Sequence, residues 1–299
     1  MKRWMKVALA FGVLLLLALG LYAIFGSDGK NNAFQPQEEF RLTPWIPINI
    51  AGIDFSINRA VFYLFLAAAA TCGSMIWIAR RMQDRPNKVQ TAVEVGYDLT
   101  ANNITRGNLP DPKLSRRWFS FIATLFFFIW FCNMLGYLPL PTSHEKIDIF
   151  GAQIPSLALY AATANISIPL ALTLVVFIVY NVEGIRAKGF IGYLKSFVPA
   201  GVEGFAVGPI FVIEVISNLV RIISLSVRLF ANILAGHLLI LFMAGGLVVL
   251  LGLAPLGIFT LLMAIPFFLF EIGLVATLQA FIFATLTSIY IGGATADEH

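Results

Sequence analysis

The chain is 299 residues long, and 59% of these residues are hydrophobic whereas only 12% are charged. Its mean hydropathy is +0.85, and a soluble domain could not bury that much apolar surface in one core. The composition therefore predicts an integral membrane protein. The formal net charge is +4, but the basic residues concentrate beside apolar segments, so we expect contact with membrane lipid and no nucleic-acid partner.

Six apolar runs are long enough to cross the bilayer as helices, which takes roughly 20 residues each. They lie at about 7–25, 59–79, 118–140, 157–181, 208–250 and 255–292. The last two exceed one perpendicular crossing, so each is broken, strongly tilted or laid partly in the membrane plane. Pro255 and its neighbouring glycines predict a turn between them. The expected fold is an all-α polytopic membrane protein in which two long tilted, membrane-embedded helices form a C-terminal hairpin.

The part of the chain before residue 59 contains a hydrophobic stretch near the N-terminus. The sequence MKRWMK, followed by apolar residues to about Phe25, fits either a signal peptide or a retained anchor. We favour the anchor because no clear small-x-small cleavage site follows. We therefore expect an N-terminal anchor or signal segment at 1–30, an extracytoplasmic segment at 31–58 and the main membrane domain at 59–299.

Basic side chains set the expected topology, because loops rich in Lys and Arg stay in the cytoplasm. A second basic stretch lies at 186–195, whereas the loop at 141–156 carries one lysine against two acidic residues. The alternation places residues 26–56 and 141–156 outside and the C-terminus in the cytoplasm. The most basic segment joins the second and third runs and contains Arg80, Arg81, Arg85, Lys88, Arg106, Lys113, Arg116 and Arg117.

Sequence motifs for catalysis are missing. No Walker loop, HExxH helix, CxxC pair or dinucleotide fingerprint occurs. The long soluble domain that ATP hydrolysis requires is also missing, so we expect a chain that is non-catalytic by itself and holds no cofactor. Cys72 and Cys132 both fall in apolar runs, and we interpret them as small buried hydrophobic residues in preference to a disulfide or a metal site.

The fifth run carries a polar stripe. At about 100° per residue, one face of a helix collects Glu214, Ser217, Asn218, Arg221, Ser224, Arg228 and Asn232. Ionisable residues at membrane depth cost roughly 2.5 to 3.5 kcal/mol each, so the stripe must meet water, a partner or another polar surface. Glu214 and Arg221 could pair at a spacing of seven and simply join helices. Arg228 has no carboxylate three or four residues away, so its counter-charge must come from elsewhere.

Two further ionisable residues flank the turn between the long helices. His237 lies nine residues after Arg228 on nearly the opposite face, and an isolated membrane histidine is more often a packing residue. Glu271 changes this interpretation, because a carboxylate and an imidazole on antiparallel membrane helices can relay protons. Gln279 and Tyr290 lie eleven residues apart and therefore share a face of the last run. The Gln279 amide needs a partner, for which Arg228 is a candidate.

The motif SVRLFAN, followed by GH, and LQAFIFATLTSIYI near the C-terminus resemble the a subunit of bacterial F-type ATP synthases, and they stand in the order expected there. The resemblance extends over about residues 40–299. It includes NMLGYLP at 133–139, TANISIPLAL at 163–172 and the acidic Glu214 fourteen positions before Arg228.

The resemblance implies a stator subunit of the Fo sector that conducts protons through inlet and outlet half-channels beside a rotating ring of c subunits. It implies that Arg228 faces this ring, prevents a proton leak and draws the proton off each arriving carboxylate, with Asn232 and Gln279 in supporting positions. It also implies b subunits of the peripheral stalk and other ATP synthase subunits as partners, and the inner (plasma) membrane of the cell as location.

The chain departs from this family pattern at two points. Many members carry glutamate where His237 stands and histidine on the last helix, so the pair is exchanged here. Glu271 also lies eight residues before Gln279, whereas the resemblance leads us to expect seven. One residue corresponds to about 100° of rotation. Either a local helical bulge restores the alignment, or Glu271 faces the inlet channel differently.

Two alternatives of other classes compete with the proton-conducting subunit. An independent ion-coupled secondary transporter would require an inverted repeat, which is not visible in the sequence. A structural membrane anchor would have no use for the polar stripe. The sequence leaves open whether the coupling ion is H⁺ or Na⁺, because the selective carboxylate would lie on the ring.

Overall fold

The computed structural model describes residues 41–50, 53–109, 111–149, 152–198, 201–202, 204–243 and 256–296. The expected helix at 7–25 and the expected turn at Pro255 lie outside these residues. Within them, five helices are long and apolar enough to cross a membrane, and the strands form only two-stranded sheets. The predicted class, an all-α polytopic membrane protein, is confirmed.

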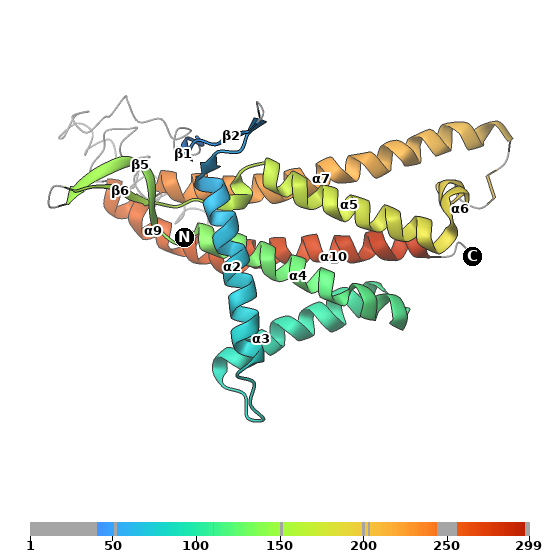
Figure 1. The fold of residues 1–299 in the computed structure, drawn as a ribbon, viewed down its shortest axis with the longest axis horizontal. Coiled ribbons are helices and arrows are strands. Elements are labelled where there is room, and N and C mark those ends of the chain that lie inside the picture. Colours follow the sequence, from blue (N-terminus) through green and yellow to red (C-terminus); the bar gives the residue numbers. More distant parts are fainter. Residues whose placement is uncertain are drawn as a thin grey trace, which may run out of the picture.

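Helix α2 (Arg59–Ala79) coincides with the expected second run. It begins there because the Asn58 side chain accepts a hydrogen bond from the Val61 amide at 3.1 Å, which caps the first turn. In Figure 1 it crosses the long helices steeply and leads to α3 (Lys88–Asp98) at its far end. The chain then continues into a π-helix, η2 (Leu99–Arg106).

Only one side of α2 is buried. Tyr63, Ala67 and Thr71 are buried at a spacing of four residues, whereas Cys72 is exposed on another side of the helix. The interpretation of Cys72 as a buried residue is therefore wrong, because an apolar run identifies a membrane span without saying which side of it packs. Cys132, on the next spanning helix, is buried as expected.

Helix α4 (Pro112–Gly136) begins six residues before the expected start at 118. Asp111 caps it by accepting a hydrogen bond from the Lys113 amide at 3.0 Å, and Pro112 suits the first turn. The first residues of this helix are mostly polar, so a hydropathy window does not assign them to the apolar run. The helix ends at Gly136, where an added Cβ would overlap the Cβ of Ala161, so this end approaches its neighbour closely.

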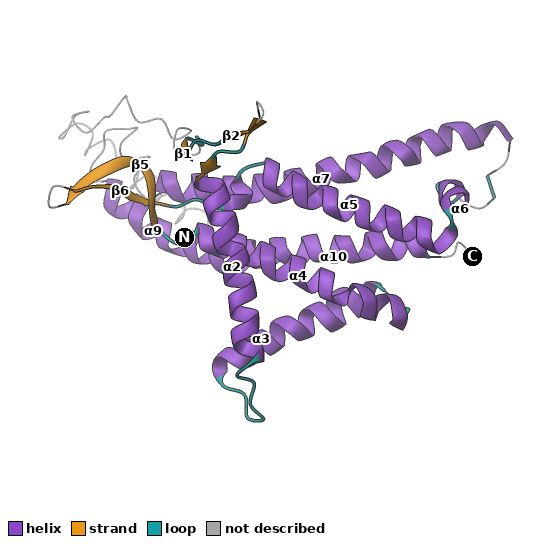
Figure 2. Cartoon of the chain, viewed as in Figure 1, coloured by secondary structure: helices purple, strands orange, loops and turns teal. Residues whose placement is uncertain are grey.

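Three small antiparallel sheets lie outside the spanning helices and are drawn in orange in Figure 2, where β5 and β6 lie at the left end and β1 and β2 lie above the start of α2. The largest pairs two strands between α4 and the next spanning helix, with Ile147 opposite Ile154. The paired strands are β1 (Pro44–Ile46) with β4 (Ile57–Asn58), β2 (Asn49–Ile50) with β3 (Ile53–Asp54), and β5 (Leu140–Ile149) with β6 (Ala152–Ala158).

Helix α5 (Ser167–Lys188) begins ten residues after the expected start at 157. Strand β6 and a 3₁₀ turn, η3 (Ala162–Ala164), occupy the intervening residues, because hydropathy alone does not distinguish a short apolar strand from a helix. The helix ends at Gly189, whose φ of 73° suits a residue without a β-carbon. The short helix α6 (Phe190–Lys195) follows.

A buried carboxylate with two exposed arginine partners ties α4 to α5 at their charged ends. Arg117 Nη1 lies 2.8 Å from Glu183 Oε1, and Arg186 Nη1 lies 3.7 Å from the other oxygen, while the glutamate side chain is only 5% exposed. A buried carboxylate is tolerated when it is paired in this way. This contact therefore fixes the relative position of the two helices that support the long hairpin.

The predicted C-terminal hairpin is formed by α7 (Val207–Leu241) and by the continuous segment α9 (Leu256–Phe270), η6 (Glu271–Val275) and α10 (Ala276–Thr295). Helix α7 has 35 residues and is therefore about 52 Å long at 1.5 Å per residue, which exceeds the roughly 30 Å hydrocarbon core. In Figure 1 α5 runs between α7 and α10 over much of their length, and both long helices pack against it. Their length agrees with the predicted tilt.

The main hydrophobic core lies where α4, α5, α7 and α10 meet. It contains Ile122, Ile129, Leu229, Ile233 and Phe283, all fully buried. The opposite side of α7 exposes large apolar side chains such as Ile213 and Ile223, as expected for a surface that contacts lipid or another membrane helix. The core therefore holds the inner face of α7 and leaves its outer face free for other contacts.

Candidate functional site

Four buried residues form a polar cluster near the end of α7, which we call the His237 cluster: Asn133, Tyr137, His237 and Glu271. The last three are 1%, 3% and 7% exposed. The Tyr137 hydroxyl donates to Glu271 Oε2 at 3.1 Å, and the Tyr137 and His237 rings lie with centroids 4.8 Å apart at 33°. The structure thus brings together the two residues that the sequence singled out as a proton-relay pair.

Both ring nitrogens of His237 face backbone carbonyl oxygens. Nδ1 lies 3.0 Å from the oxygen of Ile233, and Nε2 lies 3.1 Å from the oxygen of Gly136. A neutral imidazole has a single N–H and can donate to one of them, whereas the imidazolium donates to both. Carbonyl oxygens therefore face both nitrogens, and in the neutral ring the unprotonated nitrogen faces an oxygen without a proton between them.

Glu271 fits against α7 because residue 236 is a glycine. A Cβ added to Gly236 would overlap the Glu271 carboxylate. Glu271 also opens the π-helix η6, which has more residues per turn than an α-helix. That bulge lies between Glu271 and Gln279, and both side chains are buried, at 7% and 2% exposure. A local helical bulge is one of the two explanations for the eight-residue spacing between Glu271 and Gln279, and the structure contains such a bulge.

Asn133 lies four residues before Tyr137, near the end of α4, and links α4 to two neighbouring segments. Its Nδ2 donates to the backbone oxygen of Ala276 at 3.3 Å, and its Oδ1 accepts from Thr163 Oγ1 at 2.8 Å. The motif at 133–139 belongs to the family resemblance, but no local pattern in the sequence indicates a role for Asn133 or Tyr137. A single asparagine in an apolar run indicates that the Asn133 side chain needs a polar partner. Tyr137 gives no such signal, because tyrosines are common at helix ends near membrane interfaces.

A second polar cluster, the Tyr180 cluster, lies toward the start of α7 and joins it to α5, α6 and α10. Its members are Tyr180, Asn181, Tyr193, Glu214, Asn218, Arg221 and Tyr290. The Tyr180 hydroxyl donates to Asn218 Oδ1 at 2.6 Å, and Asn181 Oδ1 accepts from Asn218 at 3.3 Å and from Tyr193 at 2.9 Å. A pocket of about 210 Å³ opens among these side chains.

The charged residues of the Tyr180 cluster, Arg221 and Glu214, form an ion pair. Arg221 Nη2 lies 3.4 Å from Glu214 Oε1, the pairing that a spacing of seven had suggested, and its guanidinium carbon lies 5.2 Å from the Tyr290 ring centroid. Burial raises the pKa of the Tyr193 hydroxyl above its ordinary value, and the charge of Arg221 opposes this effect. Tyr193 therefore remains a neutral donor near pH 7.

An apolar layer separates the two clusters on the inner face of α7. Leu225, Leu229 and Ile233 are 2%, 0% and 0% exposed, and the buried Ser226 hydroxyl donates to carbonyls of its own helix. Asn218 and His237 are 19 residues apart, or about 28 Å along the axis. Within the part of the chain that the structure describes, no line of polar side chains bridges this distance.

Arg228 lies between the clusters but on the exposed face of α7. No residue that the structure describes gives it a hydrogen bond, an ion pair or a ring contact. The small exposed side chains on the same side of the helix are Ser217, Ser224, Ala231 and Ala235, and Asn232 and the larger Ile213 are exposed there as well. The polar stripe expected from the sequence is therefore divided: Asn218 faces the core, whereas Ser217, Ser224 and Arg228 face outward.

Gln279 pairs with Asn232 and not with Arg228. Asn232 Nδ2 donates to Gln279 Oε1 at 2.8 Å, while Gln279 Nε2 is buried without a hydrogen-bond partner among the described residues. This contact and the one between Arg221 and Tyr290 lie eleven residues apart on both helices, as antiparallel packing requires. The structure thus brings Gln279 and Tyr290, predicted to share a face, against the polar side of α7.

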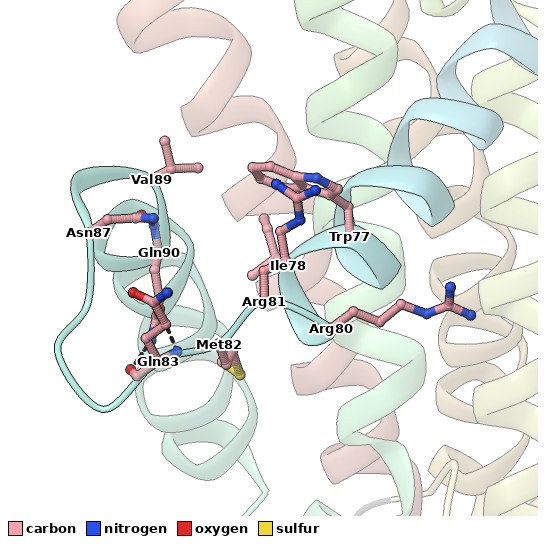
Figure 3. Close-up of a pocket in the computed structure, with 9 residues that line it drawn as sticks. All are labelled: Trp77, Ile78, Arg80, Arg81, Met82, Gln83, Asn87, Val89 and Gln90. Carbon is pink, nitrogen blue, oxygen red and sulfur yellow. Dashed lines mark hydrogen bonds between the residues drawn. The ribbon is translucent and has the colours of Figure 1, made fainter.

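A larger pocket, of about 370 Å³, lies at the junction of α2 and α3, away from both clusters. Figure 3 shows the Arg81 guanidinium over the Trp77 ring, 5.2 Å from its centroid, and Arg80 pointing away. Gln83 and Gln90 hydrogen-bond to each other through two contacts of 3.0 and 3.1 Å. These groups are satisfied within the joint, so we interpret the pocket as part of the helix connection.

Comparison with known proteins identifies the family. The model of the ATP synthase A chain family matches residues 61–292. ATP synthase subunit a 1 of Brucella anthropi is 33% identical over 273 residues, which cover 89% of this chain and 100% of that protein. The ATP synthase subunits a of Brucella ovis and Brucella melitensis are 34% identical over the same shares. The chain therefore belongs to the ATP synthase A chain family, the proton-translocating membrane subunits of the Fo sector.

Proposed function

We propose that the His237 cluster is part of the inlet half-channel, that the Tyr180 cluster is part of the outlet half-channel, and that Arg228 prevents a proton leak between them. The observation that carries this proposal is the position of Arg228. It is a membrane cation without a partner among the described residues, it lies between two polar clusters, and it faces outward. A charge that costs free energy in the membrane and stabilises nothing within the described chain is best explained by a partner molecule.

The apolar layer explains why a proton would need a partner molecule to travel from one cluster to the other. A proton cannot pass Leu225, Leu229 and Ile233, because these side chains offer no donor or acceptor. It must leave the chain from one cluster, travel on a carboxylate of a partner and return at the other cluster. Guanidinium groups stay charged at physiological pH, so an arginine at this position attracts such a carboxylate without becoming the proton carrier. Asn232 and Gln279 support this surface one turn further along.

The proposed partner at this face is the ring of c subunits. Small side chains at positions 217, 224, 231 and 235 allow another helix to approach α7 closely, and Arg228 supplies the charge that a ring carboxylate would meet. We assign the basic segment at 81–117 to the cytoplasm and to contact with b subunits of the peripheral stalk. This topology follows the positive-inside rule, sets the C-terminus in the cytoplasm and suits the inner (plasma) membrane.

Substitution of Arg228 tests the proposal. In membrane vesicles that contain the whole ATP synthase, Arg228→Ala should abolish ATP-driven proton pumping while the subunit remains inserted and assembled. The matched control is Arg80→Ala, which removes an exposed arginine that points away from the α2–α3 junction (Figure 3) and lies outside residues 81–117, and it should leave pumping intact. Normal pumping by the Arg228→Ala complex would refute the proposal.

A further inference from the structure

We propose that Tyr137 is a positioning residue of the inlet cluster, and that it holds Glu271 and His237 in their working geometry. This inference rests on the proposed role of that cluster. Its starting observation is that Tyr137 contacts both ionisable residues with different parts of one side chain. The hydroxyl donates to Glu271 Oε2 at 3.1 Å, and the ring lies against the His237 ring with centroids 4.8 Å apart.

The hydroxyl fixes the carboxylate from one side. Glu271 faces Gly236 so closely that a Cβ there would overlap it. The carboxylate is thus confined between the α7 backbone and the Tyr137 hydroxyl. Because hydrogen bonds to charged groups are about twice as strong as neutral ones, loss of this donor should release the Glu271 side chain to other rotamers.

The ring fixes the imidazole. His237 is held at its two nitrogens by the carbonyl oxygens of Ile233 and of Gly136, the residue before Tyr137, while the tyrosine ring covers its face. No direct hydrogen bond joins His237 to Glu271 among the described residues. Tyr137 is therefore the side chain through which these two residues are held relative to each other.

The surroundings of Tyr137 keep its own orientation constant. The side chain is 1% exposed, and Phe268 meets its ring edge-on with centroids 6.0 Å apart at 87°. Ile240 and Ala276 complete a small hydrophobic cluster around it. Three segments of the chain thus immobilise the ring, so the direction of the hydroxyl is set by packing and not by the hydrogen bond alone.

Two substitutions separate the hydroxyl from the ring. Tyr137→Phe keeps the ring and should lower proton flux through the reconstituted ATP synthase roughly tenfold, the effect of a lost charge-assisted hydrogen bond of about 1.5 kcal/mol. It should also change the pH profile of the flux. Tyr137→Leu removes the contact with His237 as well and should lower flux further. The control Tyr160→Phe, at an equally buried tyrosine, should leave flux and pH profile unchanged.

A second background tests whether the hydroxyl acts through Glu271. Glu271→Asp shortens the side chain and withdraws the carboxylate from the hydroxyl, so adding Tyr137→Phe should cause little further loss. An equal loss in both backgrounds, or normal flux and pH profile in Tyr137→Phe, would overturn the inference. If that occurred while Arg228→Ala still abolished pumping, the proposed function would stand and only the role of Tyr137 would fail.

Discussion

The two polar clusters along α7 differ in how their charges are compensated. In the Tyr180 cluster, Arg221 pairs with Glu214 at 3.4 Å, and the remaining groups are neutral amides and hydroxyls. In the His237 cluster, the described residues give Glu271 a hydroxyl donor but no cation. A compensated pair can keep a polar path hydrated, whereas an uncompensated buried carboxyl group is suited to gaining and losing a proton. The clusters are thus expected to respond differently to substitution.

The largest effect should come from the ionisable residues of the His237 cluster. His237→Ala and Glu271→Ala should each remove most of the proton flux of the reconstituted complex. The double variant should be less impaired than the product of the two single losses predicts, because residues in one cluster are not additive. Strictly multiplicative losses would show that the two side chains serve separate places.

A smaller effect should follow from crowding the same cluster. Gly236→Ala places a methyl group where the Glu271 carboxylate lies, and overpacking of this kind costs about 1–3 kcal/mol. We expect a several-fold loss of flux with the complex still assembled. Gly208→Ala is the matched control on the same helix, because a Cβ there meets nothing within 4 Å. Equal flux in the two variants would contradict the close fit of Glu271.

The smallest effect should come from the compensated cluster. The Arg221 and Glu214 side chains are 37% and 41% exposed, and ion pairs this accessible contribute at most about 1 kcal/mol. Arg221→Gln should therefore slow proton flux by about fivefold or less, as measured in the same vesicles. A loss as large as that of Glu271→Ala would remove the distinction between the clusters.

The sequence predicted the parts of this fold that depend on long patterns. The second run and the long C-terminal helices rest on apolar composition over many residues, and the structure contains them. The polar stripe of α7 rests on helical periodicity, and the structure divides it between a core-facing Asn218 and the outward-facing Ser217, Ser224 and Arg228. The strands between α4 and α5 were missed because residues 157–161 are apolar but too few to distinguish strand from helix. The pairing of β6 with β5 depends on a contact between two segments, which the propensity of either segment alone does not predict.

The sequence predicted only part of the candidate site. Arg228, His237 and Glu271 are visible because a charge inside an apolar run is costly. The contact of Tyr137 with Glu271 depends on where α4 ends relative to α9, which no local pattern specifies. The π-helix at η6 was signalled only by a spacing of eight residues instead of seven, and its position between Glu271 and Gln279 required the backbone itself.

The most direct test of the account asks from which side of the membrane each cluster is reached. Asn181→Cys in the Tyr180 cluster and Thr163→Cys beside Asn133 would be made in a Cys72→Ser, Cys132→Ser background. Proton flux through the assembled complex would then be measured after a small thiol reagent is added on either side. We expect the Asn181→Cys complex to be inhibited from the cytoplasmic side only and the Thr163→Cys complex from the opposite side only. Inhibition of both from the same side would contradict two separate half-channels divided at Arg228.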